Sequence, residues 1–202
     1  NNASPFVITH ELGHSLGLGH TNLIRCPGNG PDGAWANCNA IEYGGAVDVM
    51  SNVDIKGPLS TYHQWRMGII KDADVTQVWK TQTVDLKYTN ATSGTRAIFV
   101  RDGKQTYWIE YRKAADGYTP GLAIYRTDPP PASSVVSPNP SDGVDAPNEA
   151  VTSDVWLMNL DSFKYSSTAT VTGSPILPMG KVFLNSNGII SVSAAQKDLD
   201  TV

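Results

Sequence analysis

The chain has 202 residues, enough for one large domain or two small ones, and 40% of them are hydrophobic, which suffices for a core. Its net charge of −4, with no basic run, gives no indication of nucleic-acid binding, and no stretch is long and apolar enough to span a membrane. The 18 glycines and 13 prolines favour β-structure with many turns over a helical bundle.

The first predicted element is a helix that begins after Ser4 and runs to about Leu16. Ser4 is a suitable N-cap because its hydroxyl can accept a hydrogen bond from the first helical turn, and Pro5 suits the first helical position. Gly17 can adopt a positive φ, so we expect the helix to end there and the chain to turn sharply.

The run from His10 to His20 carries the most specific chemical signal, H-E-x-x-H-x-x-G-x-x-H. His10 and His14 are four residues apart and therefore project from one face of a helix. The turn at Gly17 allows His20 to reach the same metal ion. Three neutral imidazoles leave the fourth position of a tetrahedral zinc ion open, and Glu11, beside the first histidine, is the candidate general base. The short H-E-x-x-H pattern also arises by chance, but three of the chain's four histidines fall in this run.

Two cysteines, Cys26 and Cys38, lie in the glycine-rich segment that follows. We interpret them first as a disulfide that closes this segment, which implies an oxidising compartment. Two alternatives remain open. One is a pair of zinc-binding thiols, which the absence of a C-x-x-C motif disfavours, and the other is two unpaired thiols.

Met50 lies in a segment with turn character, downstream of the third histidine. Zinc peptidases with the extended histidine pattern place a methionine in such a turn, called the Met-turn. Its thioether would form an apolar floor beneath the imidazoles, although a plain core position is the alternative for any methionine. We expect Asp48 to help hold the turn.

A second helix is predicted from the N-cap Ser60 through Met67, with Gly68 as its stop. We expect Trp65 and Met67 to be core residues. We interpret His63 as structural or exposed rather than as a fourth metal ligand.

After about residue 70 the pattern changes to strand-like alternation. Residues 97–100 and 107–111 flank Asp102-Gly103, and residues 181–184 and 189–192 flank Asn187-Gly188, so each set predicts a hairpin. Residues 121–126 predict a further strand. Strands at these intervals suggest an antiparallel sandwich.

Two further expectations concern charged residues in this β-rich part. Glu110 and Arg112 alternate with apolar neighbours on one predicted strand, so we expect them to share a face as an exposed ion pair. The proline- and serine-rich stretch 128–147 is expected to be a long exposed loop. Within it, Asp142 and Asp145 are candidate calcium ligands, although their spacing matches no EF-hand loop.

On these motifs the chain resembles the gametolysin-like metzincins, a group of secreted zinc peptidases. The matching segments are the zinc motif, Cys26 and Cys38, E-Y-G at 42–44, D-V-M at 48–50, and L-S at 59–60 through M-G at 67–68, with further matches at 107–112 and 121–126. The resemblance implies an α+β fold. Residues 1–70 would be the C-terminal part of a metzincin catalytic domain, with active-site helix, Met-turn and short helix, and residues 71–202 an antiparallel β-sandwich domain. Some metzincins place a tyrosine two residues after the Met-turn methionine as an extra ligand; this chain has Asn52 there, so we expect three protein ligands.

The function implied by the resemblance is that of a secreted zinc-dependent endopeptidase. His10, His14 and His20 would hold zinc, Glu11 would act as general base, and the substrate would be a protein or glycoprotein. Metzincin catalytic domains carry an N-terminal subdomain before the zinc helix, for which the nine residues ahead of His10 are too few. We therefore expect a fragment, a clipped product or half of a split protein, partnered by the N-terminal portion of its own catalytic domain. The alternative is a binding or adhesion module, in which the β-sandwich recognises a glycan or protein and the zinc region is inactive.

Overall fold

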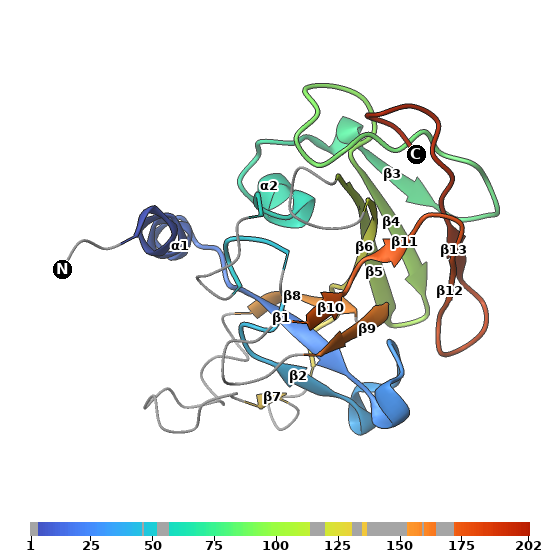
Figure 1. Cartoon of the computed structure of the whole chain (residues 1–202), viewed down its shortest axis with the longest axis horizontal. Coiled ribbons are helices and arrows are strands. Elements are labelled where there is room, and N and C mark those ends of the chain that lie inside the picture. The colour runs from blue at the N-terminus through green and yellow to red at the C-terminus, as the bar shows by residue number, and fades with distance from the viewer. Residues whose placement is uncertain are drawn as a thin grey trace.

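A computed structural model of the chain describes residues 4–45, 47–51, 57–113, 120–130, 135–136, 153–158, 160–164 and 172–202. Within these ranges the fold is α+β, with a large sheet and few helices (Figure 1). The expected α+β class is confirmed at this level. None of the helices in the described part of the chain has the length and apolar character needed to cross a membrane.

Both predicted helices are confirmed, with the predicted caps. α1 (Pro5–Ser15) begins at Ser4, whose hydroxyl accepts a hydrogen bond from the amide of Val7. α2 (Thr61–Arg66) begins at Ser60, and a glycine with a φ of +70° follows it at position 68. The 3-10 helices are η1 (Pro27–Asn29), η2 (Trp35–Asn37) and η3 (Asp72–Asp74).

One nine-stranded sheet forms the centre of the molecule. Its strands, in spatial order, are β3 (Val75–Val78), β4 (Ala97–Asp102), β5 (Gln105–Arg112), β6 (Gly121–Arg126), β8 (Ser153–Met158), β1 (His20–Arg25), β2 (Asn39–Ile41) and β7 (Val135–Val136), with β11 (Leu177–Pro178) on β6. Two small sheets pair β9 (Asp161–Lys164) with β10 (Thr172–Ser174), and β12 (Val182–Leu184) with β13 (Ser191–Ser193). The hairpins expected around Asp102-Gly103 and Asn187-Gly188 are therefore confirmed as β4–β5 and β12–β13.

The sheet is mixed rather than antiparallel throughout. The pairs β3–β4, β1–β8 and β2–β7 are parallel. The antiparallel arrangement expected for residues 71–202 is therefore wrong at β3–β4, while the other two parallel pairs each include a strand that precedes residue 70. Residue alternation reveals which side chains share a face, but it carries no information on the direction of the neighbouring strand. Because β1 pairs with β8, one sheet draws strands from both sides of residue 70; the division of the chain at that residue stays a prediction.

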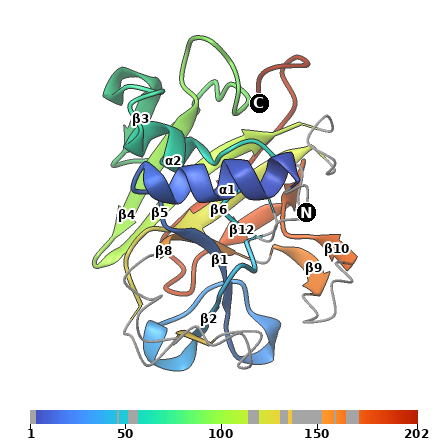
Figure 2. The ribbon, with the colours of Figure 1, turned by 90° about the vertical axis from the view of Figure 1, so that its left-hand side faces the viewer.

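The two faces of the sheet are covered by different elements. Along β5, Tyr107, Ile109 and Tyr111 belong to the same core cluster as Phe183 of β12. Trp108, between them, packs in the cluster of the opposite face, against the tyrosine and tryptophan of α2. Figures 1 and 2 show α1 and α2 on one side of the sheet and β12–β13 on the other. The helical side carries the histidine motif.

The pair Glu110 and Arg112 corrects one expectation. The two side chains share a face and lie 2.6 Å apart, as alternation predicts, but both are fully buried rather than exposed. The start of α2 covers them, since Glu110 accepts hydrogen bonds from Thr61 and Tyr125, and Arg112 donates to the carbonyl of Pro58. These partners offset part of the desolvation cost that two buried charges carry. The pair fastens α2 to the sheet.

The predicted disulfide between Cys26 and Cys38 is present. It closes the segment between β1 and β2, which Asp32 anchors to the sheet through an ion pair with Arg126 and a hydrogen bond from Tyr107. Neither thiol is therefore available for zinc. Asn52, Asp142, Asp145 and most of the stretch 128–147 lie outside the described residues, so the predictions made on them stay predictions. Where that stretch is described, the expectation of a long exposed loop is wrong, because Pro130 is buried and Val135–Val136 form β7, which pairs with β2.

Candidate metal centre

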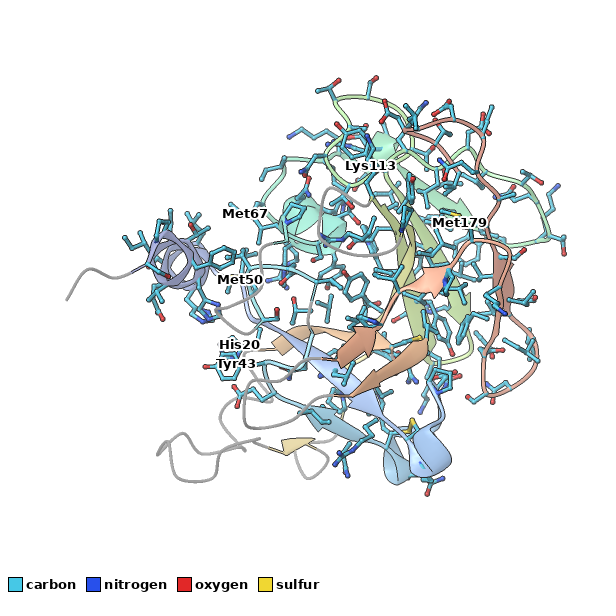
Figure 3. The ribbon with its side chains drawn as sticks, viewed as in Figure 1. His20, Tyr43, Met50, Met67, Lys113 and Met179 are labelled. Atoms are coloured by element: carbon cyan, nitrogen blue, oxygen red, sulfur yellow. A yellow bond between two sulfur atoms is a disulfide. The ribbon has the colours of Figure 1, made fainter. Side chains whose placement is uncertain are left out.

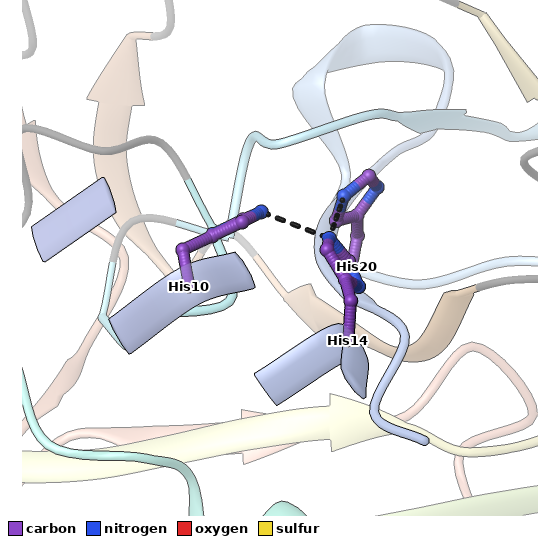
Figure 4. A group of neighbouring side chains, drawn as sticks. All are labelled: His10, His14 and His20. Atoms are coloured by element: carbon purple, nitrogen blue, oxygen red, sulfur yellow. Dashed lines mark hydrogen bonds between the residues drawn. The ribbon is translucent and has the colours of Figure 1, made fainter. Parts of the chain in front are cut away.

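Three histidines converge at the junction of α1 and β1. His10 and His14 project from one face of α1, and His20 is the first residue of β1 (Figure 4). The Nε2 atom of His14 lies 3.1 Å from Nε2 of His10 and 3.0 Å from Nε2 of His20. The sharp turn that returns His20 to the helix runs through Gly17, whose φ of +85° suits glycine. The candidate ligand atoms lie within 4.8 Å of one another.

The other ring nitrogen of each histidine is held by an oxygen acceptor. Nδ1 of His10 lies 2.8 Å from the carbonyl oxygen of Val49, and Nδ1 of His14 lies 2.9 Å from that of Leu18. Nδ1 of His20 lies 2.9 Å from a carboxylate oxygen of Glu42. Since carbonyl and carboxylate oxygens only accept, each Nδ1 carries the proton. In a neutral ring with the proton on Nδ1, the Nε2 atom that faces the other histidines is unprotonated.

This arrangement fits a metal ion. The lone pair on Nε2 of His14 lies about 3 Å from each of the other two Nε2 atoms and is repelled by their lone pairs unless a cation lies among them, and a hydrogen bond across either gap needs an extra proton. Tetrahedral zinc with bonds of 2.0–2.1 Å places its nitrogen ligands about 3.3 Å apart, within a few tenths of an ångström of these two separations. Histidines that bind metal through Nε2 also characteristically donate Nδ1–H to a carbonyl or carboxylate oxygen. The three histidines could therefore hold a metal ion.

Burial favours the neutral form of the first histidine. The pKa of His10 is lowered, chiefly because the ring is buried, and the charges of His14 and His20 add to this effect. The hydrogen bond to the carbonyl of Val49 and the charge of Glu11 act in the opposite direction without reversing it. A neutral imidazole retains the lone pair that a metal requires.

Glu11, the predicted general base, lies outside the histidine cluster, and its role stays a prediction. It follows His10 directly on α1, its side chain is exposed, and it is not part of the group of close ligand atoms. It is near enough for its charge to raise the pKa of His10. A carboxylate beside, but outside, the ligand set can accept a proton from water at the open side of the site.

Met50 packs against α1, the helix that carries His10 and His14. It is fully buried in a turn, and a Cβ atom placed on Gly13 would lie only 2.4 Å from its sulfur. The glycine between His10 and His14 therefore permits a close approach that any other residue would block. Figure 3 shows Met50 with His20 on the side of the molecule where α1 lies.

Asp48 fastens this turn, as expected. Its carboxylate accepts hydrogen bonds from the amides of Met50 and Ser60, from the hydroxyl of Thr21, and from Nδ1 of His63. Burial raises the pKa of Asp48, but the hydrogen bond and charge of His63, together with the charge of the arginine at position 112, lower it more. The carboxylate therefore stays ionised and joins β1, the turn and α2. His63 is buried, which agrees with the structural rather than the exposed position expected for it.

No family model, curated protein or solved structure matches the chain. The interpretation of the centre therefore rests on its own geometry.

Sequence reasoning assigned no role to two residues at this centre. Glu42 is fully buried and holds His20, and the ring of Tyr43 lies against His20, with 4.1 Å between centroids (Figure 3). Tyr43 also has a φ of +54°, which is rare for a bulky residue, and its amide donates to the side chain of Asn22. The sequence did contain a signal for Glu42, because this carboxylate directly follows the apolar pair at positions 40–41. A carboxylate that is buried with such neighbours needs a polar partner.

Proposed function

We propose that the protein is a zinc-dependent endopeptidase, similar to the gametolysin-like metzincins, with His10, His14 and His20 as its zinc ligands. The observation that carries the proposal is the convergence of three Nε2 atoms whose rings are each oriented by an acceptor on Nδ1. Structural zinc sites have four protein ligands, whereas three with an open fourth position are typical of catalysis. Within the described residues this histidine cluster is the one group suited to hold a metal ion.

Zinc, when bound, supplies a Lewis acid that polarises a substrate carbonyl and makes water a stronger acid. The chain's own residues supply the proton transfers. The carboxylate of Glu11 accepts a proton from the attacking water and then delivers it to the leaving amine nitrogen. Glu42 and the carbonyls of Val49 and Leu18 keep the three rings in one orientation throughout.

A partner surface on α1 supports the expectation of further polypeptide beside the site. Ile8, Leu12 and Leu16 are each more than half exposed and, spaced four residues apart, line one side of the helix. A protein does not usually leave such a stripe uncovered next to its chemistry. We infer that it is covered by the N-terminal portion of the catalytic domain, and that a protein or glycoprotein substrate binds at the edge so formed. The disulfide favours an extracellular location.

Two variants test this proposal, with the polypeptide that covers α1 supplied. His14→Ala should abolish stoichiometric zinc binding, measured by elemental analysis, since it removes one of three ligands. Glu11→Gln should retain zinc and slow peptide hydrolysis by about 10²–10⁴-fold, because the amide cannot accept the proton. Asp85→Asn, which changes an exposed carboxylate paired with Lys197, is the matched control and should behave as wild type.

Full zinc retention by His14→Ala would disprove the ligand set, and equal turnover by Glu11→Gln and wild type would disprove the role of Glu11. If the wild type binds zinc and cleaves no member of a broad peptide library, the peptidase proposal fails and the binding module is favoured.

A further inference from the structure

A second candidate site lies on the opposite side of α2 from the Met-turn. It is a cavity of about 280 Å³ that is lined by α2, η3, the strands β3, β4 and β5, and the residue that follows β6. None of the three histidines lines it. α2 separates the two regions, because His63 faces Asp48 while Tyr62 and Trp65 line the cavity. A ligand there would therefore bind without contact to the metal centre.

Aromatic rings form the wall of this cavity. The rings of Tyr62, Trp65 and Trp108 pack against one another with their centroids 5.3–5.8 Å apart, and Phe99 is the fourth aromatic residue of the lining. Two rings are fixed at their polar edges: the indole N–H of Trp65 donates to Asp72, and that of Trp108 donates to the hydroxyl of Thr61. The indole planes are thus held in place before any ligand arrives, which lowers the entropic cost of binding.

Four polar side chains also line the cavity. Asp72 and Gln77 are exposed, and the hydroxyls of Thr106 and Thr127 lie 2.8 Å apart. One of these two hydroxyls donates to the other, which leaves the second hydrogen available to a ligand. The carboxylate of Asp72 only accepts hydrogen bonds, and the side-chain amide of Gln77 both donates and accepts them. The cavity therefore offers acceptors and donors around an aromatic wall.

We propose that this cavity binds one pyranose ring of a neutral carbohydrate. A pyranose has a flat face of C–H groups that packs on an aromatic ring, and a rim of hydroxyls that each donate and accept. Both halves of that description have counterparts in the lining. An organic cation would use Asp72 and the rings but make no use of the hydroxyl hydrogen of the threonine pair or of the amide of Gln77. A purely apolar ligand would displace water from the exposed carboxylate and amide without replacing its hydrogen bonds, which is costly on binding. The site goes beyond the proposed peptidase and does not depend on it.

The test is a titration followed by NMR of the indole N–H signals. The chain has five tryptophans, of which Trp65 and Trp108 line the cavity and Trp35, Trp79 and Trp156 do not. The probes are the neutral methyl pyranosides of glucose, galactose, mannose and xylose, with tetramethylammonium as the cationic comparison. We expect saturable shifts of the two lining indoles with at least one pyranoside, with a dissociation constant in the millimolar range, as for a ligand of this size.

Variants decide whether the shifts come from this cavity. Trp65→Ala should weaken pyranoside binding about tenfold or more, by loss of the aromatic wall. Gln77→Ala removes an exposed side chain and should also weaken binding while leaving the thermal unfolding temperature unchanged, so the test stands even if Trp65→Ala fails to fold. Trp79→Ala is the matched control, because this tryptophan is 70% exposed and lies outside the cavity.

Two results would overturn the proposal. One is the absence of saturable shifts at the lining indoles with every pyranoside, with or without a response to tetramethylammonium. The other is pyranoside binding that Trp65→Ala and Gln77→Ala leave as tight as in Trp79→Ala.

Discussion

At the proposed zinc site, replacing Glu42 should weaken metal binding without removing a proposed ligand. The residue is fully buried, and its carboxylate oxygen lies 2.9 Å from Nδ1 of His20. A carboxylate at this position fixes the ring and increases the basicity of the opposite nitrogen, and loss of such a partner usually costs 10–100-fold in metal affinity. Glu42→Gln keeps an oxygen acceptor and loses the charge, so we expect a loss of about tenfold. Glu42→Ala also leaves Nδ1–H without its acceptor, so we expect about a hundredfold, or about 2.7 kcal/mol.

The assay is competition for zinc with a chromophoric chelator at one fixed pH. Asp32→Asn provides the matched control. Asp32 is also a buried carboxylate, but it lies on the loop closed by the disulfide and pairs with Arg126 rather than with a histidine. This control should lower thermal stability and leave zinc affinity unchanged. Wild-type affinity in Glu42→Gln and Glu42→Ala, or an equal loss in Asp32→Asn, would refute the argument that Glu42 acts through His20.

Three further predictions concern stability. Replacing Cys26 and Cys38 together by serine should lower the free energy of unfolding by about 3 kcal/mol, the chain-entropy value for a loop of this length, and an unchanged value in urea unfolding would contradict it. The pKa of Asp48 is depressed, because its hydrogen bonds and neighbouring positive charge outweigh burial, so its contribution is present above about pH 4 and is lost as the pH falls through the folded-state pKa. Asp48→Asn should therefore flatten the acid side of the stability–pH profile measured by denaturant unfolding. Arg112→Met should cost about 3–5 kcal/mol in the same measurement by leaving Glu110 as an unpaired buried charge; a change below 1 kcal/mol would show that water reaches the pair.

The elements that sequence predicted are those fixed by neighbouring residues. Ser4 and Ser60 cap helices within their own first turns, and Asn187-Gly188 closes a hairpin between adjacent strands. The disulfide was also predictable, because both cysteines lie in one short segment. In each of these cases the partners are close along the chain, so the local pattern contains the whole interaction.

What sequence could not predict depends on distant segments. The parallel pairing of β1 with β8 joins strands more than a hundred residues apart, and the sequence of neither strand indicates the other as its partner. The exposure assigned to Glu110 and Arg112 was wrong because alternation identifies a shared face but not what covers it, which is the start of α2. Trp65 was expected in the core; it packs on the sheet and also lines a cavity that exists only once β3 and β4 are placed beside α2.

The disulfide also has a bearing on the order of assembly. The β1–β2 ladder pairs Leu23 with Ile41 and Arg25 with Asn39, and Cys26–Cys38 is the next rung in the same register. A slip of one residue would turn every side chain to the opposite face, so that Glu42 could no longer meet His20. The covalent bond at one end of the ladder therefore favours the alignment that places Glu42 beside His20 at the other. If the proposed zinc site forms, oxidation of the cysteines should precede tight zinc uptake during refolding.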